Sequence, residues 1–263
     1  FHIKINSGMN RFGLNNKEDV TYIVNNSNNN LINEGIYSHL SNGSLYSEEY
    51  SNAIAKFIEL TSLIDLNKIP IVHLDRSLTM EQHDKIPFAN GVRLGIIMYG
   101  FANPGYYPSV KVKIFNTLKF KKTIVVNPKL KLESIFSFKT EVIKINKIKK
   151  GEIVGYSGMY KAKENQTIAI LPYGYADYLY NNLTEVCINN KLYPTIAINM
   201  DVTFIKIDDT VKVGDMVEIF GDVITTRKKA ENTNTNIYKL LASVSNRVPR
   251  IYISKDKRYE IKY

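Results

Sequence analysis

Short apolar runs alternate with helical patterns over the first hundred residues. Residues 1–6, 35–40 and 69–74 are rich in Ile, Val and Leu, which predicts three β-strands. Residues 17–24 and 47–66 have the spacing of helices, and the second of these opens on Ser-Glu-Glu, a favourable helix start. Strand–helix–strand order is typical of a parallel α/β barrel, where functional side chains follow the carboxyl ends of the strands.

The pattern changes after residue 118, where regular alternation of strand and helix stops. Short strands are predicted instead, with one late helix at 236–246; the strands lie at 136–145, 152–155, 167–171, 184–188, 203–207 and 216–220. The longer stretches 154–160 and 166–177, which overlap two of these strands, each have the pattern of a β-strand. The fold class is therefore α/β plus all-β: an α/β barrel part at 1–118, then a β-rich domain, barrel- or sandwich-like, at 119–263.

Composition narrows the class of protein. The chain has 263 residues, of which 44% are hydrophobic and 23% charged, as in globular proteins, and no run of 18 apolar residues predicts a membrane span. The single Cys187 excludes an internal disulfide framework and suits a reducing cytosol. We predict no metal site. The net charge of +10 comes mostly from scattered lysines, many alternating with apolar residues as on a solvated sheet face, and no nucleic-acid-binding signature accompanies them.

One tyrosine stands out among these strands. Tyr156 is flanked by Gly155 and Gly158, so no bulky neighbour in the sequence shields its hydroxyl. A tyrosine can transfer protons if a nearby cation lowers its pKa from about 10. The alternative is an aromatic side chain packed in a core, and composition alone does not decide between them.

Two segments here resemble the C-terminal domain of alanine racemases, pyridoxal phosphate (PLP) enzymes of fold type III. Val154-Gly155-Tyr156 matches a V-x-Y segment, and Pro172–Asp177 matches P-x-G-Y-A-D. The resemblance implies that Tyr156 is one of two catalytic bases and that Tyr175 and Asp177 border the entrance to the site. Met200 falls in the family's C-M-D segment and is implied to contact substrate.

The first residues resemble the family segment H-x-K-x-D-T-G-M-x-R-x-G. By this match Lys4 is the lysine that many members carry as a carbamate, and Arg11 is a catalytic arginine near the substrate carboxylate. Asn6 and Asn10 depart from the usual Asp and Gly. His39 matches a G-x-x-[ST]-H strand, whose histidine links the cofactor-binding arginine to the catalytic tyrosine.

Two further matches imply a cradle for PLP. Arg93-Leu94-Gly95-Ile96 resembles R-x-G-[IL], which assigns Arg93 to the pyridine nitrogen and the backbone N–H groups of Gly95 and Ile96 to the phosphate. Ser77 resembles the serine of an Asn-Ser pair that bonds the phosphate. Arg76 occupies the asparagine position, a clear departure from the family.

Near the end of the chain, Ser245–Arg250 resembles a [ST]-x-R-[VL]-x-R segment. Many alanine racemases have tyrosine where Asn246 stands, lining the space for the substrate side chain. Asparagine resembles the serine/alanine racemases of the vancomycin-resistance type. A polar group at this position discriminates differently between alanine and serine, so Asn246 leaves both substrates open.

The resemblance implies a racemase that interconverts L- and D-alanine, supplying D-alanine for peptidoglycan in the cytoplasm of a bacterium. It also implies a homodimer whose subunits share the active sites. The family's Schiff-base lysine lies in a V-x-K-A-N-A-Y-G-H-G segment that does not occur here. We therefore expect the C-terminal half of a TIM-type barrel plus the β-domain: a fragment, inactive by itself, whose parent is attached to a membrane if its missing part carries spans. A non-catalytic PLP-binding or dimerisation relic and a basic surface-binding protein are the alternatives.

Overall fold

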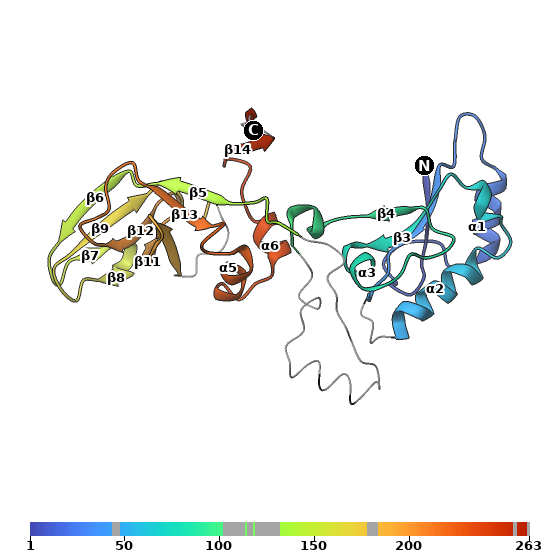
Figure 1. Cartoon of the computed structure of the whole chain (residues 1–263), viewed down its shortest axis with the longest axis horizontal. Helices are drawn as coiled ribbons and strands as arrows, with labels where there is room; N and C mark the ends of the chain where they lie inside the picture. Colours follow the sequence, from blue (N-terminus) through green and yellow to red (C-terminus); the bar gives the residue numbers. More distant parts are fainter. Residues whose placement is uncertain are drawn as a thin grey trace. The chain divides into compact units, whose positions relative to one another are not determined.

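The computed structural model describes residues 1–43, 48–101, 114, 118, 132–177, 184–254 and 257–261. It divides the chain into two compact units, Phe1–Ser134 and Ile135–Tyr263, which we describe separately (Figure 1). The predicted division between residues 118 and 119 borders residues 119–131, which lie outside the described part together with their lysines. No helix in the described ranges has both the length and the hydropathy needed to span a bilayer.

The first unit is built on a parallel sheet whose four strands follow the chain order β1-β2-β3-β4. The strands are β1 (His2–Ile5), β2 (Gly35–Ser38), β3 (Ile71–Arg76) and β4 (Gly91–Arg93). Helices α1 (Lys17–Asn25), α2 (Glu48–Leu60) and α3 (Ser77–Gln82) and the 3₁₀ turns η1 (Leu66–Lys68) and η2 (Ile96–Tyr99) connect or follow them. The predicted α/β order is confirmed for these elements, although α2 ends six residues earlier than predicted.

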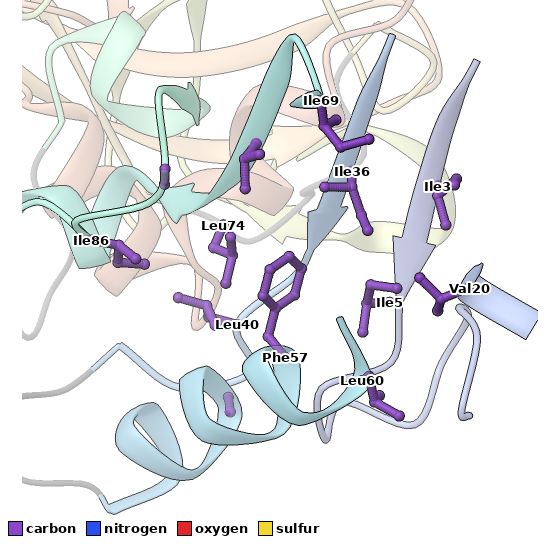
Figure 2. Close-up of a cluster of buried hydrophobic side chains, with 13 residues drawn as sticks. Ile3, Ile5, Val20, Ile36, Leu40, Phe57, Leu60, Ile69, Leu74 and Ile86 are labelled. Atoms are coloured by element: carbon purple, nitrogen blue, oxygen red, sulfur yellow. The ribbon is translucent and has the colours of Figure 1, made fainter. Parts of the chain in front are cut away.

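Helix α2 closes one face of this sheet. Ala53, Phe57 and Leu60 are its buried positions, and their helical spacing places them on one side. Figure 2 shows Phe57 pointing from α2 into the space among Leu40, Ile36 and Leu74. Burial of a phenylalanine of this kind stabilises the fold by roughly 1.5–3 kcal/mol, so this apolar face fixes the sheet on the helices and leaves the strand ends for polar side chains.

The second unit is built on an antiparallel sheet with the strand order β5-β13-β10-β11-β12-β9-β6. Its strands are β5 (Phe138–Glu141), β6 (Lys144–Ile148), β9 (Gln166–Leu171), β10 (Glu185–Ile188), β11 (Lys191–Ile198), β12 (Thr203–Ile207) and β13 (Met216–Phe220). Two hairpins and two short helices complete the described part: β7 (Ile153–Val154) with β8 (Tyr160–Lys161), β14 (Arg250–Ser254) with β15 (Lys257–Ile261), α5 (Thr226–Asn232) and α6 (Ile237–Ala242).

The single strand predicted over 136–145 is wrong, because the chain changes partner in its middle. The N–H of Val142 donates to the carbonyl of Asp215, directly before β13, and the N–H of Ile143 donates to the carbonyl of Ile170 in β9. The strands before and after this point, β5 and β6, are therefore the two ends of the strand order. Only two residues join β5 to β6, so the sheet curls around toward a barrel-like form.

The strand predicted over 154–160 is also wrong. Residues Tyr156–Gly158 form a 3₁₀ turn, η4, between the short strands β7 and β8. Gly155, Ser157 and Gly158 have φ angles of 78°, 51° and 71°, in the left-handed region that a regular strand does not use. Gly155 and Gly158 are evident in the sequence, but the turn of the chain at Tyr156 is not.

Candidate active site

Four cationic side chains gather where the strands of the first unit end. They are Lys4 of β1, Arg11 of the following loop, Arg76 of β3 and Arg93 of β4, and all four act on the imidazole of His39 just after β2. Parallel strands bring these carboxyl ends to one edge of the sheet, as the sequence predicted. The result is an edge suited to an anionic ligand.

Arg93 is at the centre of this edge. Its Nη1 lies 2.9 Å from Nδ1 of His39, and its Nη2 donates to the carbonyl of Leu74 at 3.3 Å and to that of Ser38. Its guanidinium also lies over the ring of Tyr37, 5.1 Å from the centroid. The buried Nε has no partner in the part of the chain that the structure describes. This donor is available to a ligand.

The contact with Arg93 fixes the protonation of His39. Arginine only donates hydrogen bonds, so Nδ1 accepts and the neutral ring carries its proton on Nε2. Burial, followed by the charges of Arg93, Arg76, Arg11 and Lys4, lowers the pKa of His39 to about 4. The ring is therefore neutral near pH 7 and presents an Nε2–H donor.

The loop after β1 carries Arg11 back toward this edge. Leu14 donates its N–H to the Lys4 carbonyl at 2.8 Å, and Asn6 donates to that of Leu14 at 2.9 Å. Gly13, with φ 124°, permits this return, because a Cβ there would lie 2.6 Å from the backbone nitrogen of Asn6. Arg11 itself is exposed.

Lys4 lies half-buried beside two aromatic rings. Its Nζ is 5.3 Å from the ring centroid of Phe12 and 5.8 Å from that of Tyr37. Desolvation, then the charges of Arg11 and Arg93, lowers the pKa of Lys4. A lowered pKa increases the fraction of neutral amine, the form that a carbamate requires. Carbamylation of Lys4 stays a prediction.

Ser77 and Gly95 form a small polar cradle. The N–H of Gly95 donates to Oγ of buried Ser77 at 3.0 Å, and Ile96 begins the η2 turn directly afterwards. A Cβ on Gly95 would lie 3.8 Å from the Ser77 hydroxyl, so glycine keeps the space over it open. The Ser77 hydroxyl accepts the bond from Gly95 and keeps its own O–H to donate, so this cradle beside a cationic edge fits a phosphate. The unpartnered Nε of Arg93 fits an acceptor such as a pyridine nitrogen. The residues present therefore suit PLP. No cluster of metal ligands occurs among the described residues.

Tyr156 lies in the second unit and is 73% exposed, so the interpretation as a core aromatic is wrong. The turn that carries it packs beside the loop after β11. A Cβ on Gly155 would lie 3.3 Å from Cβ of Ala197 and 3.5 Å from Oδ1 of Asn199. That Oδ1 is buried and has no partner among the described groups. Asn199 is the family's cysteine position in the C-M-D segment.

The loop after β11 also holds the segment with Tyr175. The N–H of Tyr175 donates to the carbonyl of Asn199 at 3.1 Å, and that of Ala176 donates to Met200 at 2.9 Å. Gly174 allows this approach, because a Cβ there would lie 2.3 Å from the Asn199 oxygen. Tyr156, Tyr175 and Met200, all three largely exposed, therefore border one region of the unit.

Asp177 connects this region to the end of the chain. Its buried carboxylate accepts the Gly174 N–H at 3.0 Å and lies 3.1 Å from Nε of Arg247. Its carbonyl accepts the N–H of Ser245 at 2.9 Å, so exposed Asn246 is held between two residues bonded to Asp177. The segment Ser245–Arg250 contains Arg247, but its ion pair with Asp177 was not predicted from the sequence. The predicted proximity of Tyr156 to Arg11 and His39, across the subunits of the expected homodimer, stays a prediction.

Both units match known proteins. Residues 1–103 match the family model "Alanine racemase, N-terminal domain", and residues 135–252 match "Alanine racemase, C-terminal domain". The chain is 34% identical to alanine racemase 1 of Clostridium acetobutylicum, covering 99% of this chain and 67% of that protein. It is 32% identical to the alanine racemase of Clostridium novyi, with the same coverage of 99% and 67%.

Solved structures agree. The alanine racemase of Bacillus anthracis with bound L-Ala-P superposes with a TM-score of 0.80 at 28% identity, covering 100% of this chain and 67% of that one. A histidine racemase from Leuconostoc mesenteroides, at 22% identity and a TM-score of 0.75, shares the fold alone. These matches define the class: PLP-dependent isomerases that join an N-terminal barrel domain to a β-rich C-terminal domain. Within this class, the chain belongs to the alanine racemase family. It spans about two-thirds of the length of these relatives.

Proposed function

We propose that this chain provides the cofactor cradle and one proton-transfer residue of a PLP-dependent racemase that interconverts L- and D-alanine. The observation that carries the proposal is the contact of Arg93 with His39, which leaves a buried guanidinium Nε without a partner beside the Ser77–Gly95 cradle. In the cell the reaction would supply D-alanine for peptidoglycan, in the cytoplasm of a bacterium. The four parallel strands would then be the second half of an eight-stranded barrel.

The cradle residues have distinct tasks in this proposal. Bound PLP supplies an electron-withdrawing ring that acidifies the α-proton of an amino acid. Arg93 would donate to the ring nitrogen, while Ser77 and the backbone of Gly95 and Ile96 would hold the phosphate. Arg11 pairs with the substrate carboxylate, for which a planar guanidinium is suited.

Proton transfer falls to Tyr156. Its phenolate oxygen takes the α-proton on one face of the substrate, and in the reverse direction its hydroxyl returns it. The Nε2–H of His39 and the charge of Arg11 stabilise the phenolate in the assembled dimer, in which each subunit contributes to the other's site. The entrance to that site runs past Tyr175 and Asp177, with Met200 lining the substrate side.

Racemisation needs a second base on the opposite face, and the family uses its Schiff-base lysine for this. The K-A-N-A-Y-G segment that carries this lysine does not occur in the 263-residue sequence. We propose that the 263-residue chain alone has no turnover and that activity requires a polypeptide with that segment.

Serine is the second candidate substrate. The observation that favours it is Asn246, exposed between Ser245 and Arg247, which both bond Asp177 at the border of the Tyr156 region. An amide at this position can hydrogen-bond a substrate hydroxyl.

One experiment tests these points together. Racemisation of L-alanine and L-serine is measured with added PLP for the 263-residue chain and for a fusion that places a relative's N-terminal third, with its lysine segment, before Phe1. We expect turnover only in the fusion, loss of at least about 10²-fold in Tyr156→Phe, and a lower serine-to-alanine ratio of kcat/KM in Asn246→Tyr. Turnover by the chain alone would refute the requirement for the lysine segment. A folded fusion without turnover would favour the alternative of a non-catalytic PLP-binding or dimerisation relic.

A further inference from the structure

Arg76 departs from the Asn-Ser pair of the family, and the structure gives this side chain defined partners. Its Nε donates to the carbonyl of Leu40 at 3.0 Å, and its Nη2 lies 3.5 Å from the carbonyl of Ser41. Its own backbone is fixed as well, because its N–H donates to Oγ1 of Thr79 at 2.8 Å. The guanidinium thus bridges the end of β3 to the segment directly after His39.

The position of Arg76 puts it among like charges. It pairs in register with Arg93 on the neighbouring strand β4. The charged groups that act on His39 come from three strands and one loop: Lys4 of β1, Arg11 of the loop after it, Arg76 of β3 and Arg93 of β4. None of these four is an acid. A fourth cation raises the positive potential at an imidazole that already faces three.

Asp75, the sequence neighbour of Arg76, does not offset this charge. Asp75 is buried, its carboxyl is hydrogen-bonded to the side chain of Thr79 on α3, and it is not among the charges that act on His39. Burial also raises the pKa of its carboxyl, which favours the neutral form. The ring of His39 therefore experiences the charge of Arg76 without a compensating carboxylate from the same strand.

We infer that Arg76 is a positioning residue for His39: its guanidinium fixes the backbone directly after the histidine, and its charge opposes protonation of the imidazole. The inference deepens the proposed function, because it concerns the same site. Its geometric basis, the bonds to the Leu40 and Ser41 carbonyls, does not depend on turnover.

The tautomer of His39 shows why opposition to its protonation matters. Protonation would place a hydrogen on Nδ1, where Arg93 now donates, and two donors would then face each other. The contact that orients Arg93 would be lost. A cation held beside the ring by two backbone carbonyls keeps the imidazole neutral over a wider pH range, so the Nε2–H donor and the Arg93 contact persist together.

The test follows His39 by NMR titration of the imidazole in the 263-residue chain without cofactor. Arg76→Asn introduces the residue of the family motif, so we expect it to fold. Arg76→Lys keeps the positive charge but lacks the several N–H donors of the guanidinium. Exposed Lys68→Gln in the same unit is the matched control for loss of one positive charge. The four histidines are distinguished by single His→Gln substitutions.

We expect the proton-binding constant of His39 to rise about threefold or more in Arg76→Asn and to stay near the wild-type value in Arg76→Lys and Lys68→Gln. In Arg76→Asn the Leu40 carbonyl carbon should also shift, reporting the lost hydrogen bond. An unchanged His39 titration in a folded Arg76→Asn would overturn the inference, and so would a rise of the same size in Lys68→Gln.

If Arg76→Asn does not fold, a salt titration of the wild-type chain takes its place. Screening by added salt should raise the His39 pKa, and no response would be contrary evidence. Because no turnover is measured, failure of the proposed racemase activity leaves this result readable.

Discussion

Asn6 organises the loop that carries Arg11. Its Oδ1 accepts the N–H of Asn10 at 2.9 Å, while its Nδ2 donates to Oδ1 of Asn10 at 3.1 Å and to that of Asn15 at 2.8 Å. Asn10 has φ 55°, a conformation that asparagine tolerates better than most residues and that glycine adopts freely. The two departures from the D…G pattern of the family are therefore coupled: the amide at position 6 can bond the amide at position 10, whereas a carboxylate cannot donate.

This coupling predicts that substitutions at positions 6 and 10 are non-additive in a double-mutant cycle. Asn6→Asp removes two donated hydrogen bonds and should lower the free energy of unfolding of the first unit by about 1 kcal/mol. In the Asn10→Gly background, Asn6→Asp should lower the free energy of unfolding by a smaller amount. Urea unfolding at pH 7 measures both, with exposed Asn30→Asp as the control for the added charge. Equal costs in the two backgrounds would show that the positions are independent.

At the scale of elements, helix α5 buries a lysine against strand β10. Lys229 is only 3% exposed; its Nζ lies 3.3 Å from the carbonyl of Glu185 and also donates to the hydroxyl of Thr184. Burial lowers the pKa of Lys229 to about 8, from 10.5. The unfolded chain therefore binds more protons between about pH 8 and 10.5, and the stability of the second unit should rise with pH across this window. Below pH 8 both states are protonated, and the full cost of the buried charge is present.

Replacement by an apolar side chain of similar length should relieve that cost. We expect Lys229→Met to raise the free energy of unfolding at pH 7 by about 1–2 kcal/mol, after loss of the bonds to Thr184 and Glu185, and to flatten the rise above pH 8. Exposed Lys228→Met on the same helix is the matched control and should do neither. Thermal unfolding at pH 7, 8.5 and 10 decides this; a lower melting temperature in Lys229→Met would mean that its hydrogen bonds outweigh the buried charge.

For the whole molecule, the two units differ in how acid affects them. The first unit contains His39 and His73, and burial with the nearby Arg93 charge lowers the pKa of each to about 4. Unfolding allows both rings to bind protons below about pH 6.5. In the second unit, hydrogen bonds from Lys191 and Thr210 lower the pKa of Asp208, which affects stability only at more acidic pH. The raised pKa of Asp75 acts in the opposite sense within the first unit.

We therefore expect the first unit to lose stability as pH falls from 6.5 to 4, while the second unit changes little over that range. Hydrogen exchange followed by mass spectrometry resolves the two units by peptide. His39→Gln and His73→Gln should each reduce the loss in the first unit, and exposed Lys68→Gln should not. Equal acid sensitivity of both units, or no effect of the histidine variants, would contradict this account.

Much of the fold follows from local pattern. The alternating and helical spacing of apolar residues predicted β1, β2, β3, α1 and α2, because each element buries one face and its period is set by backbone geometry. Strand β11 was missed, since Pro194 interrupts its pattern. In the sheet Pro194 lies beside β10, before the pairing with β12 begins at Thr195, so its missing N–H costs little. Helix α5 was missed because it is only 7 residues long and mostly polar.

The sequence by itself determined the family, the strand ends that carry charge, and the identity of Arg93, His39, Ser77 and Tyr156 as candidates, because these depend on residue type and spacing along the chain. Tertiary structure alone decided what each side chain meets. It places Arg76 on the backbone after His39, turns the chain so that Tyr156 is exposed, and sets Arg247 on Asp177. The contact of Arg93 with His39 joins residues 54 positions apart and that of Arg247 with Asp177 joins residues 70 positions apart, and no local pattern encodes such a distance.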